Sequence, residues 1–122
     1  MPLLNILYAE DDAWLALSVR EMLEEEGWRV KVCENGWAAL EEIESHESYD
    51  LLLLDNHLPG VNGLELARRA RLLPHRRHTP IIIISASESG REARQSGADL
   101  FLKKPENISV IVEQVSKLTR RA

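Results

Sequence analysis

The sequence predicts an α/β domain in which five βα units form a doubly wound, five-stranded parallel sheet with helices on both faces. Short apolar runs alternate along the chain with longer segments whose apolar residues recur at helical spacing. The length of 122 residues suits one domain, and no linker, repeat or low-complexity segment divides it. We therefore expect one domain over residues 1–122.

Five short runs are predicted as strands: Leu4 to Ala9, Trp28 to Val32, Leu51 to Leu54, Ile81 to Ile84 and Leu100 to Leu102. The third and fourth are apolar at every position, which is typical of strands covered on both faces, so we expect them at the centre of the sheet. In the second, Val30 and Val32 alternate with charged residues, which predicts a half-exposed strand. Cys33 is interpreted as a small core residue on a strand.

Five segments with helical spacing are predicted as helices: Ala13 to Glu26, Trp37 to Ile43, Leu64 to Leu73, Glu88 to Gln95 and Ile108 to Leu118. Gly27 is a suitable stop for the first, and Trp37, Leu40 and Ile43 are expected to share one face of the second. The fourth has only Ala93 as an apolar anchor, so we expect it to be short or displaced.

Composition excludes several classes of protein. A net charge of −5 argues against a nucleic-acid surface, and Arg68, Arg69, Arg71 and the run from His75 to His78 are interpreted as a solvated helix face and loop. The start of the chain lacks the features of a signal peptide, and the longest apolar runs are far too short to span a membrane. A single cysteine suits a reducing compartment, so we expect a cytoplasmic protein.

Chemically distinctive residues follow four of the five predicted strands. They are Glu10-Asp11-Asp12 after the first strand, Asp55 after the third, Ser85 after the fourth and Lys103-Lys104-Pro105 after the fifth. Because the carboxyl ends of parallel strands meet at one edge of the sheet, these residues are expected to converge there. Clustered carboxylates repel one another unless a cation is present, and sites of carboxylate oxygens with room for water suit Mg²⁺.

Such a site has the parts needed to transfer a phosphoryl group. The Asp55 carboxylate is a candidate nucleophile, while the ammonium of Lys104 and the hydroxyl of Ser85 can hold phosphoryl oxygens. Each part alone has an ordinary structural explanation, since acidic residues cap helices and most lysines are surface residues. Their placement at successive strand ends favours the functional interpretation.

With these residues at its predicted strand ends, the sequence resembles the receiver domains of response regulators in two-component phosphorelays. The resemblance covers essentially the whole chain, and its matching stretches are Ile6 to Asp12, Tyr49 to Gly63, Pro80 to Ala86 and Gly97 to Pro105. The second is the most specific, with an apolar strand, an Asp and then Leu-Pro-Gly-x-x-Gly. It implies a flavodoxin-like sheet with strand order 2-1-3-4-5.

The resemblance also assigns roles to individual residues. It makes Asp55 the phosphoacceptor, Ser85 and Lys104 its catalytic partners, Phe101 an aromatic switch that turns inward as Ser85 moves, and Lys104–Pro105 a candidate cis peptide. Mg²⁺ would be bound by Glu10, Asp11, Asp55 and the backbone carbonyl of His57. Asp11 would bind directly and Glu10 mostly through water.

The implied partners are a histidine kinase or histidine phosphotransfer protein upstream and a protein partner or output domain downstream, with neither nucleic acid nor membrane. The chain stops just past its last predicted helix, so we expect no output domain within it, and a homodimer is left open. The domain would catalyse only its own phosphorylation and dephosphorylation, so it is not expected to be an enzyme in the metabolic sense.

Four alternatives have weaker support. A pseudo-receiver would bind protein partners without using Asp55, although every site position is chemically competent. A phosphohydrolase with an Asp nucleophile usually has a second acid two residues on, where this chain has His57, and flavin binding is disfavoured by the acids after the first strand. A zinc site using His57, His75 or His78 is a poor fit to their predicted positions.

Overall fold

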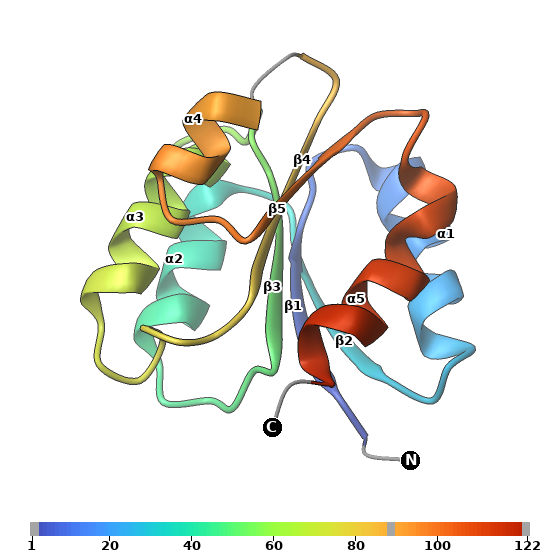
Figure 1. Cartoon of the computed structure of the whole chain (residues 1–122), viewed down its shortest axis with the longest axis horizontal. Coiled ribbons are helices and arrows are strands. Elements are labelled where there is room, and N and C mark those ends of the chain that lie inside the picture. Colours follow the sequence, from blue (N-terminus) through green and yellow to red (C-terminus); the bar gives the residue numbers. More distant parts are fainter. Residues whose placement is uncertain (1–2, 88–89, 121–122) are drawn as a thin grey trace.

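The structure is a computed structural model that describes residues 3–87 and 90–120. Strands and helices alternate along the described chain (Figure 1). The strands are β1 (Asn5–Ala9), β2 (Arg29–Cys33), β3 (Leu51–Asp55), β4 (Ile81–Ser85) and β5 (Leu100–Lys103). The helices are α1 (Ala13–Glu24), α2 (Gly36–Glu44), α3 (Gly63–Leu72), α4 (Gly90–Gln95) and α5 (Ile111–Thr119), the last preceded by a 3₁₀ turn η1 (Ile108–Val110).

The strands form one parallel sheet in the order β2-β1-β3-β4-β5, which confirms the predicted fold class and strand order. β3 lies at the centre, with Tyr8 of β1 opposite Leu53 and Asp55 opposite Ile84 of β4. All residues of β3 and β4 are buried, as their apolar sequences predict. The reversal of strand order between β1 and β3 is the position at which sheets of this kind bind ligands at their carboxyl edge.

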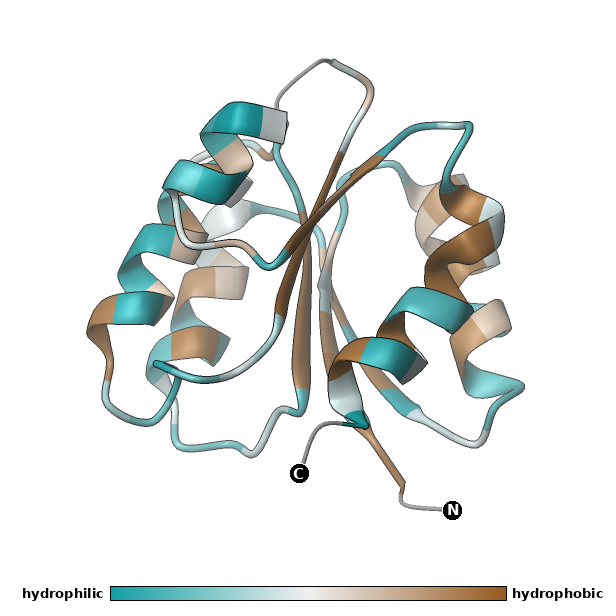
Figure 2. Ribbon diagram, viewed as in Figure 1, coloured by the Kyte–Doolittle hydropathy of each residue, from teal (hydrophilic) through white to brown (hydrophobic). Residues whose placement is uncertain are grey.

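Helices cover both faces of the sheet, with α1 and α5 on one side and α2, α3 and α4 on the other (Figure 1). Alternate strand residues supply the two cores: Leu51 and Leu53 pack on the α1 and α5 side, and Leu52 and Leu54 on the opposite side. The strands are correspondingly brown in Figure 2, whereas the outer faces of the helices are largely teal. Burial of each such side chain contributes about 1.5–3 kcal/mol, so the two-sided core fixes the sheet that carries the strand ends.

Side-chain caps define where three helices begin. Asp12 accepts hydrogen bonds from the backbone N–H groups of Trp14 and Leu15 at the start of α1, and Asn35 and Asn62 cap α2 and α3 in the same way. These caps satisfy N–H groups that have no partner within the helix. Each capped helix begins directly after a strand-end loop, so the caps also fix the loops at the carboxyl edge.

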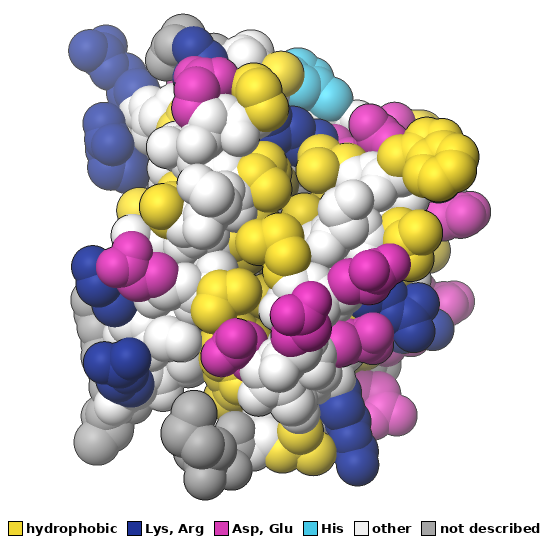
Figure 3. All heavy atoms as spheres, turned by 90° about the vertical axis from the view of Figure 1, so that its right-hand side faces the viewer, with side chains coloured by type: hydrophobic (Ala, Val, Ile, Leu, Met, Phe, Trp, Pro, Cys, Tyr) yellow, Lys and Arg dark blue, Asp and Glu magenta, His cyan; other side chains and the backbone are white. Residues whose placement is uncertain are grey.

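The short fourth helix is confirmed: α4 has 6 residues and buries only Ala93. Its predicted first two residues, Glu88 and Ser89, lie outside the described residues. On the α1 and α5 side, apolar side chains reach the surface, with both acidic and basic side chains around them (Figure 3). None of the helices in the described ranges is long and apolar enough to cross a membrane.

Two predictions, one from helical spacing and one from the clustered basic residues, are wrong. Trp37 does not share the buried face of Leu40 and Ile43, since its side chain is 63% exposed and lies beside Gly60 in the loop after β3. Arg76 is not solvated but 3% exposed, and Arg71 is also drawn inward. Both guanidinium groups donate hydrogen bonds to backbone carbonyls, which explains how charged residues from a basic run come to be buried.

The two edges of the sheet differ in what they carry. β1 begins and α5 ends at the amino edge, at the bottom of Figure 1. The predicted site residues follow the carboxyl ends of the strands at the opposite edge.

Candidate functional site

Four strand ends bring the predicted site residues to the carboxyl edge of the sheet. Glu10 follows β1, Asp55 ends β3, Ser85 ends β4 and Lys104 follows β5. Glu10, Asp55 and Ser85 are almost completely buried, with exposed fractions of 1%, 2% and 0%. Buried polar groups need hydrogen-bond partners, so the partners of these three residues define the site.

Lys104 is the cation shared by the two buried carboxylates. Its Nζ lies 2.9 Å from Oε1 of Glu10 and 3.2 Å from Oδ2 of Asp55. Since one ammonium faces two carboxylates, the three side chains carry a net negative charge when both acids are ionised. The arrangement therefore favours the approach of a further cation.

The surroundings of Glu10 and Lys104 raise the pKa of both side chains. Burial raises the pKa of Glu10, the hydrogen bond from Lys104 opposes that shift and the charge of Asp55 adds to it, giving a pKa of about 7. Burial alone would lower the pKa of Lys104, but the carboxylates of Glu10 and Asp55 outweigh it and raise that pKa above its ordinary value. Lys104 is therefore a permanent cation at neutral pH, whereas Glu10 is poised to gain or lose a proton.

Tyr8 is a site residue that sequence reasoning missed. Its hydroxyl donates a hydrogen bond of 3.3 Å to Oε1 of Glu10, and its side chain is fully buried in β1. Burial first, and then the Glu10 carboxylate, raises the pKa of Tyr8 far above its ordinary value, so the hydroxyl remains a donor. The available signal was the spacing, because residues two apart on a strand point to the same face.

The residues present fit a magnesium ion. Carboxylate oxygens of Glu10, Asp11 and Asp55 lie within 4.8 Å of one another, and hard oxygen donors of this kind suit Mg²⁺. Asp11 is exposed, whereas the other two are buried, so the group opens to solvent on the Asp11 side. A hollow of about 210 Å³ beside Glu10 and Asp11 continues between α1 and the end of β2.

The backbone after Asp55 turns back over its carboxylate. The N–H of His57 donates a hydrogen bond of 3.1 Å to Oδ1 of Asp55, while Lys104 holds Oδ2. Each carboxylate oxygen can accept more than one hydrogen bond, so Asp55 keeps lone pairs for another partner. The predicted use of the His57 carbonyl as a metal ligand stays a prediction.

The hydroxyl of Ser85 belongs to a short polar chain beside the site. Its Oγ lies 3.1 Å from Oγ of Ser87, which in turn lies 3.1 Å from Nε2 of His57. These contacts join the loop after β4 to the loop after β3. Either hydroxyl can be the donor in the Ser85–Ser87 contact, and the N–H of Ser87 also donates a hydrogen bond of 3.2 Å to Oγ of Ser85.

Phe101 lies in β5, partly buried, and packs against the core on the side of α4. Its ring atom Cδ2 comes within 3.7 Å of the position that a Cβ on Gly90 would occupy. Phe101 therefore lies close to the start of α4. The Lys104–Pro105 peptide bond is cis, as the X–Pro sequence allows.

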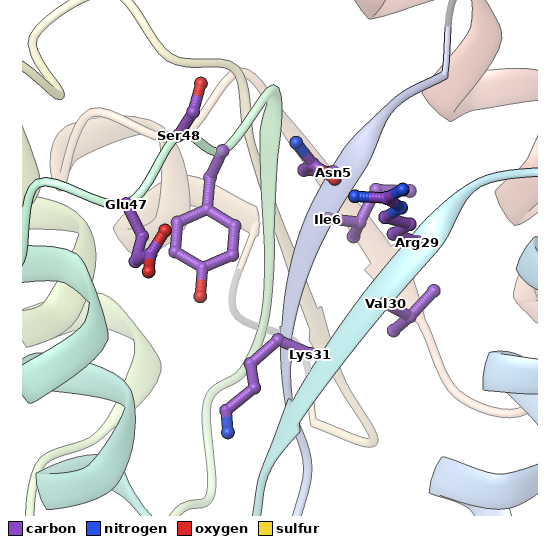
Figure 4. A pocket seen from close by; sticks show the side chains of 8 residues that line it. Asn5, Ile6, Arg29, Val30, Lys31, Glu47 and Ser48 are labelled. Carbon is purple, nitrogen blue, oxygen red and sulfur yellow. The ribbon is translucent and has the colours of Figure 1, made fainter.

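Another hollow lies away from these residues. It has a volume of about 300 Å³ and is lined by Asn5, Ile6, Arg29, Val30, Lys31, Glu47, Ser48 and Tyr49 (Figure 4). Arg29 and Lys31 reach it from β2, while Glu47 and Ser48 belong to the segment before β3. No predicted site residue lines it.

Comparison with known proteins decides the family. A family model for the response regulator receiver domain matches residues 6–116. The chain belongs to this family. It is a receiver domain of two-component signalling, as the resemblance predicts, and receiver domains bind Mg²⁺ at an acidic pocket.

Relatives of this receiver domain occur in longer proteins. The phosphate regulon transcriptional regulatory protein PhoB of Rhizobium meliloti is 38% identical over 122 residues, which cover 97% of this chain and 53% of that protein. The sensory/regulatory protein RpfC of Xanthomonas campestris pv. campestris is 30% identical over 120 residues, which cover 94% of this chain and 16% of that protein. The chain thus spans about half of one relative and a smaller share of the other.

Solved structures agree with the fold of this receiver domain. The receiver domain of a Francisella response regulator has a TM-score of 0.87 and 31% identity, over 97% of this chain and 98% of that chain. The receiver domain of the sensor histidine kinase PA1611 from Pseudomonas aeruginosa PAO1 has a TM-score of 0.88 and 25% identity, over 98% of this chain and 100% of that chain. The latter structure has a magnesium ion coordinated in its active-site cleft.

Proposed function

We propose that Asp55 accepts a phosphoryl group from the histidine of a kinase or histidine phosphotransfer protein and that the domain then changes conformation to regulate a downstream partner. The observation that carries this proposal is the shared cation: two buried carboxylates converge on Lys104 at the carboxyl edge of the sheet. A structural ion pair needs only one carboxylate for each lysine. The second carboxylate is explained by a role in chemistry.

In the proposed reaction, an oxygen of Asp55 attacks the phosphorus of the donor. A P–O bond forms while the P–N bond to the donor imidazole breaks, and the leaving imidazole takes a proton from water. Lys104 remains beside the transferred group and neutralises one of its oxygens. In dephosphorylation, water attacks the phosphorus, the P–O bond to Asp55 breaks, and the carboxylate and inorganic phosphate are released.

Glu10, Asp11, Asp55 and the His57 carbonyl are the groups that would hold Mg²⁺ in this proposal. The metal, when bound, neutralises the acidic pocket and the anionic phosphoryl group so that the two can approach. Ser85 would leave Ser87 and donate its hydroxyl hydrogen bond to a phosphoryl oxygen. Phe101 would turn toward the space that this movement opens and report the phosphorylated state to the α4 side.

The test is phosphorylation by a small donor. We expect incubation with acetyl phosphate and Mg²⁺ to add the mass of one phosphoryl group to the intact protein, and chelation of the metal to prevent it. Asp55→Asn removes the nucleophile while preserving shape, so this variant is expected to gain no phosphoryl mass. The measurement is intact-protein mass spectrometry at matched times.

Asp12→Asn is a matched control, because it also removes one carboxylate charge near the site. Asp12 is the N-cap of α1, and an asparagine can accept the same hydrogen bonds. The control is expected to be phosphorylated at the rate of the wild type. A wild-type protein that gains no phosphoryl mass, or an Asp55→Asn variant that gains as much as the wild type, would refute the proposal. The first result would instead favour the pseudo-receiver.

The remaining features follow from the same proposal. The domain would catalyse its own phosphorylation and dephosphorylation and would not turn over an external metabolite. Its partners would be proteins rather than nucleic acid or membrane, in keeping with a net charge of −5. Cys33, the single cysteine, is buried and suits a cytoplasmic location.

A further inference from the structure

The backbone at the start of α2 contacts the loop between β3 and α3, here called the β3–α3 loop. The N–H of Gly36 donates a hydrogen bond of 2.8 Å to the carbonyl of Pro59. A Cβ placed on Gly36 would overlap the carbonyl oxygen of Val61. Any other residue at this position would force the loop away from the helix, so the contact depends on glycine.

Trp37 covers the same loop from outside. Its ring atoms Cδ1 and Nε1 would lie 2.5 and 2.6 Å from a Cβ on Gly60, so the indole rests directly on the backbone at that glycine. Gly60 has a φ of +89°, a conformation that other residues rarely adopt. Because Trp37 is 63% exposed, this contact contributes little to the core, and the conformation of the loop is what it can affect.

The β3–α3 loop contacts Asp55 at both of its ends. Near its start, the N–H of His57 donates to the Asp55 carboxylate, 3.1 Å away. At its end, a Cβ on Gly63 would lie 2.5 Å from the Asp55 carbonyl oxygen, so the first turn of α3 also lies against Asp55. The loop backbone therefore cannot shift without moving groups that contact the phosphoacceptor.

We propose that Trp37 is a positioning residue that holds the β3–α3 loop, and with it the carbonyl of His57, in place for magnesium. The inference rests on the proposed function, since it concerns the same metal site. Metal affinity depends on the groups that orient the ligands as well as on the ligands, and their loss typically costs about 10–100-fold. A carbonyl ligand on a loop is especially exposed to this effect because loops move more than the elements they join.

The test compares Trp37→Ala, Trp37→Phe and wild type by calorimetric titration with MgCl₂. We expect Trp37→Ala to raise the Mg²⁺ dissociation constant about tenfold. Trp37→Phe, which restores a ring over Gly60, is expected to recover most of the affinity. Unfolding by urea in EDTA should be nearly the same for all three, because the ring is mostly exposed.

A second measurement needs no metal. Amide hydrogen exchange in EDTA is expected to be faster at residues 57–61 in Trp37→Ala than in wild type, while strand amides keep their protection. Leu72→Ala is the matched control, since Leu72 is an exposed apolar residue, 79% accessible, at the far end of α3. It should change neither the Mg²⁺ affinity nor the exchange of the loop.

Unchanged Mg²⁺ affinity in Trp37→Ala, or an equal loss of affinity in Leu72→Ala, would overturn the inference. Failure of the wild type to bind Mg²⁺ would refute the proposed metal site instead. In that case the exchange experiment still decides the positioning role, because unchanged protection of residues 57–61 in Trp37→Ala would show that the indole does not hold the loop.

Discussion

Among the residues that the structure describes, charged side chains are buried in two regions of this receiver domain, and the two regions compensate the charge in different ways. At the amino edge, Arg76 donates hydrogen bonds to the carbonyls of Ile43, Glu42, Ser45 and Glu47, which satisfies both the guanidinium and the end of α2. At the carboxyl edge, two buried carboxylates share the single ammonium of Lys104. In the first region the carbonyls compensate the positive charge of Arg76. In the second region the excess negative charge of the two carboxylates still attracts another cation.

The difference separates a buried charge that is compensated by backbone carbonyls from buried charges that can still bind a further cation. Carbonyl dipoles at the C-terminal end of a helix suit a cation and leave nothing further to bind. Like charges held together cost stability and persist where they serve a purpose. The comparison can be tested by removing charge from each region in turn.

The largest effect is expected at the amino edge. Arg76→Met removes the guanidinium donor to the carbonyls of Ile43 and Glu47, and we expect a loss of about 3 kcal/mol in the free energy of unfolding. Urea denaturation measures it. The adjacent Arg77→Met is the control, because Arg77 is exposed and its loss should cost less than about 0.5 kcal/mol. Equal midpoints for the two variants would contradict the structural role of Arg76.

At the carboxyl edge, removal of a charge should have the opposite sign. Asp55→Asn leaves Glu10 and Lys104 as a one-to-one pair, so we expect the protein in EDTA to gain about 1–2 kcal/mol from relieved repulsion. Asp12→Asn, a change of charge outside the shared pair, should leave stability nearly unchanged. A destabilised Asp55→Asn protein would show that the two carboxylates do not compete for Lys104.

A third test concerns the dependence of stability on pH. The pKa of Glu10 is raised from 4.5 to about 7, mainly by burial, so between these values the folded state holds a proton that the unfolded state has lost. The contribution of Glu10 to stability therefore falls as pH rises from about 4.5 to about 7 and is constant above that range. Urea denaturation in EDTA should show Glu10→Gln gaining stability relative to wild type across this range. A constant difference between the two proteins would contradict the raised pKa.

Much of the fold and of the candidate site could be predicted, because the strands and the residues that directly follow them can be recognised from short segments of sequence. The apolar runs of β3 and β4 identify central strands, and parallel strands bring Asp55 and Ser85 to one edge whatever the details of the loops. The short α4 was also foreseeable, since its segment contains little apolar surface to bury.

The errors involve contacts between residues far apart in the chain. Arg76 is buried because carbonyls about thirty residues away, from Glu42 to Glu47, are left exposed by the end of α2. Trp37 is exposed because its ring lies on Gly60 rather than on the sheet. Periodicity identifies a helix face, but it contains no information on which distant loop will meet that face.

The placement of the two ends of the fold has a practical consequence. β1 begins and α5 ends at the amino edge, while the site opens at the other edge (Figure 1). A strand of this length separates the two by about 16 Å. A flexible tether at either end can therefore attach the domain to a sensor surface with Asp55 and Lys104 facing the solution, so that the attachment does not block the candidate site.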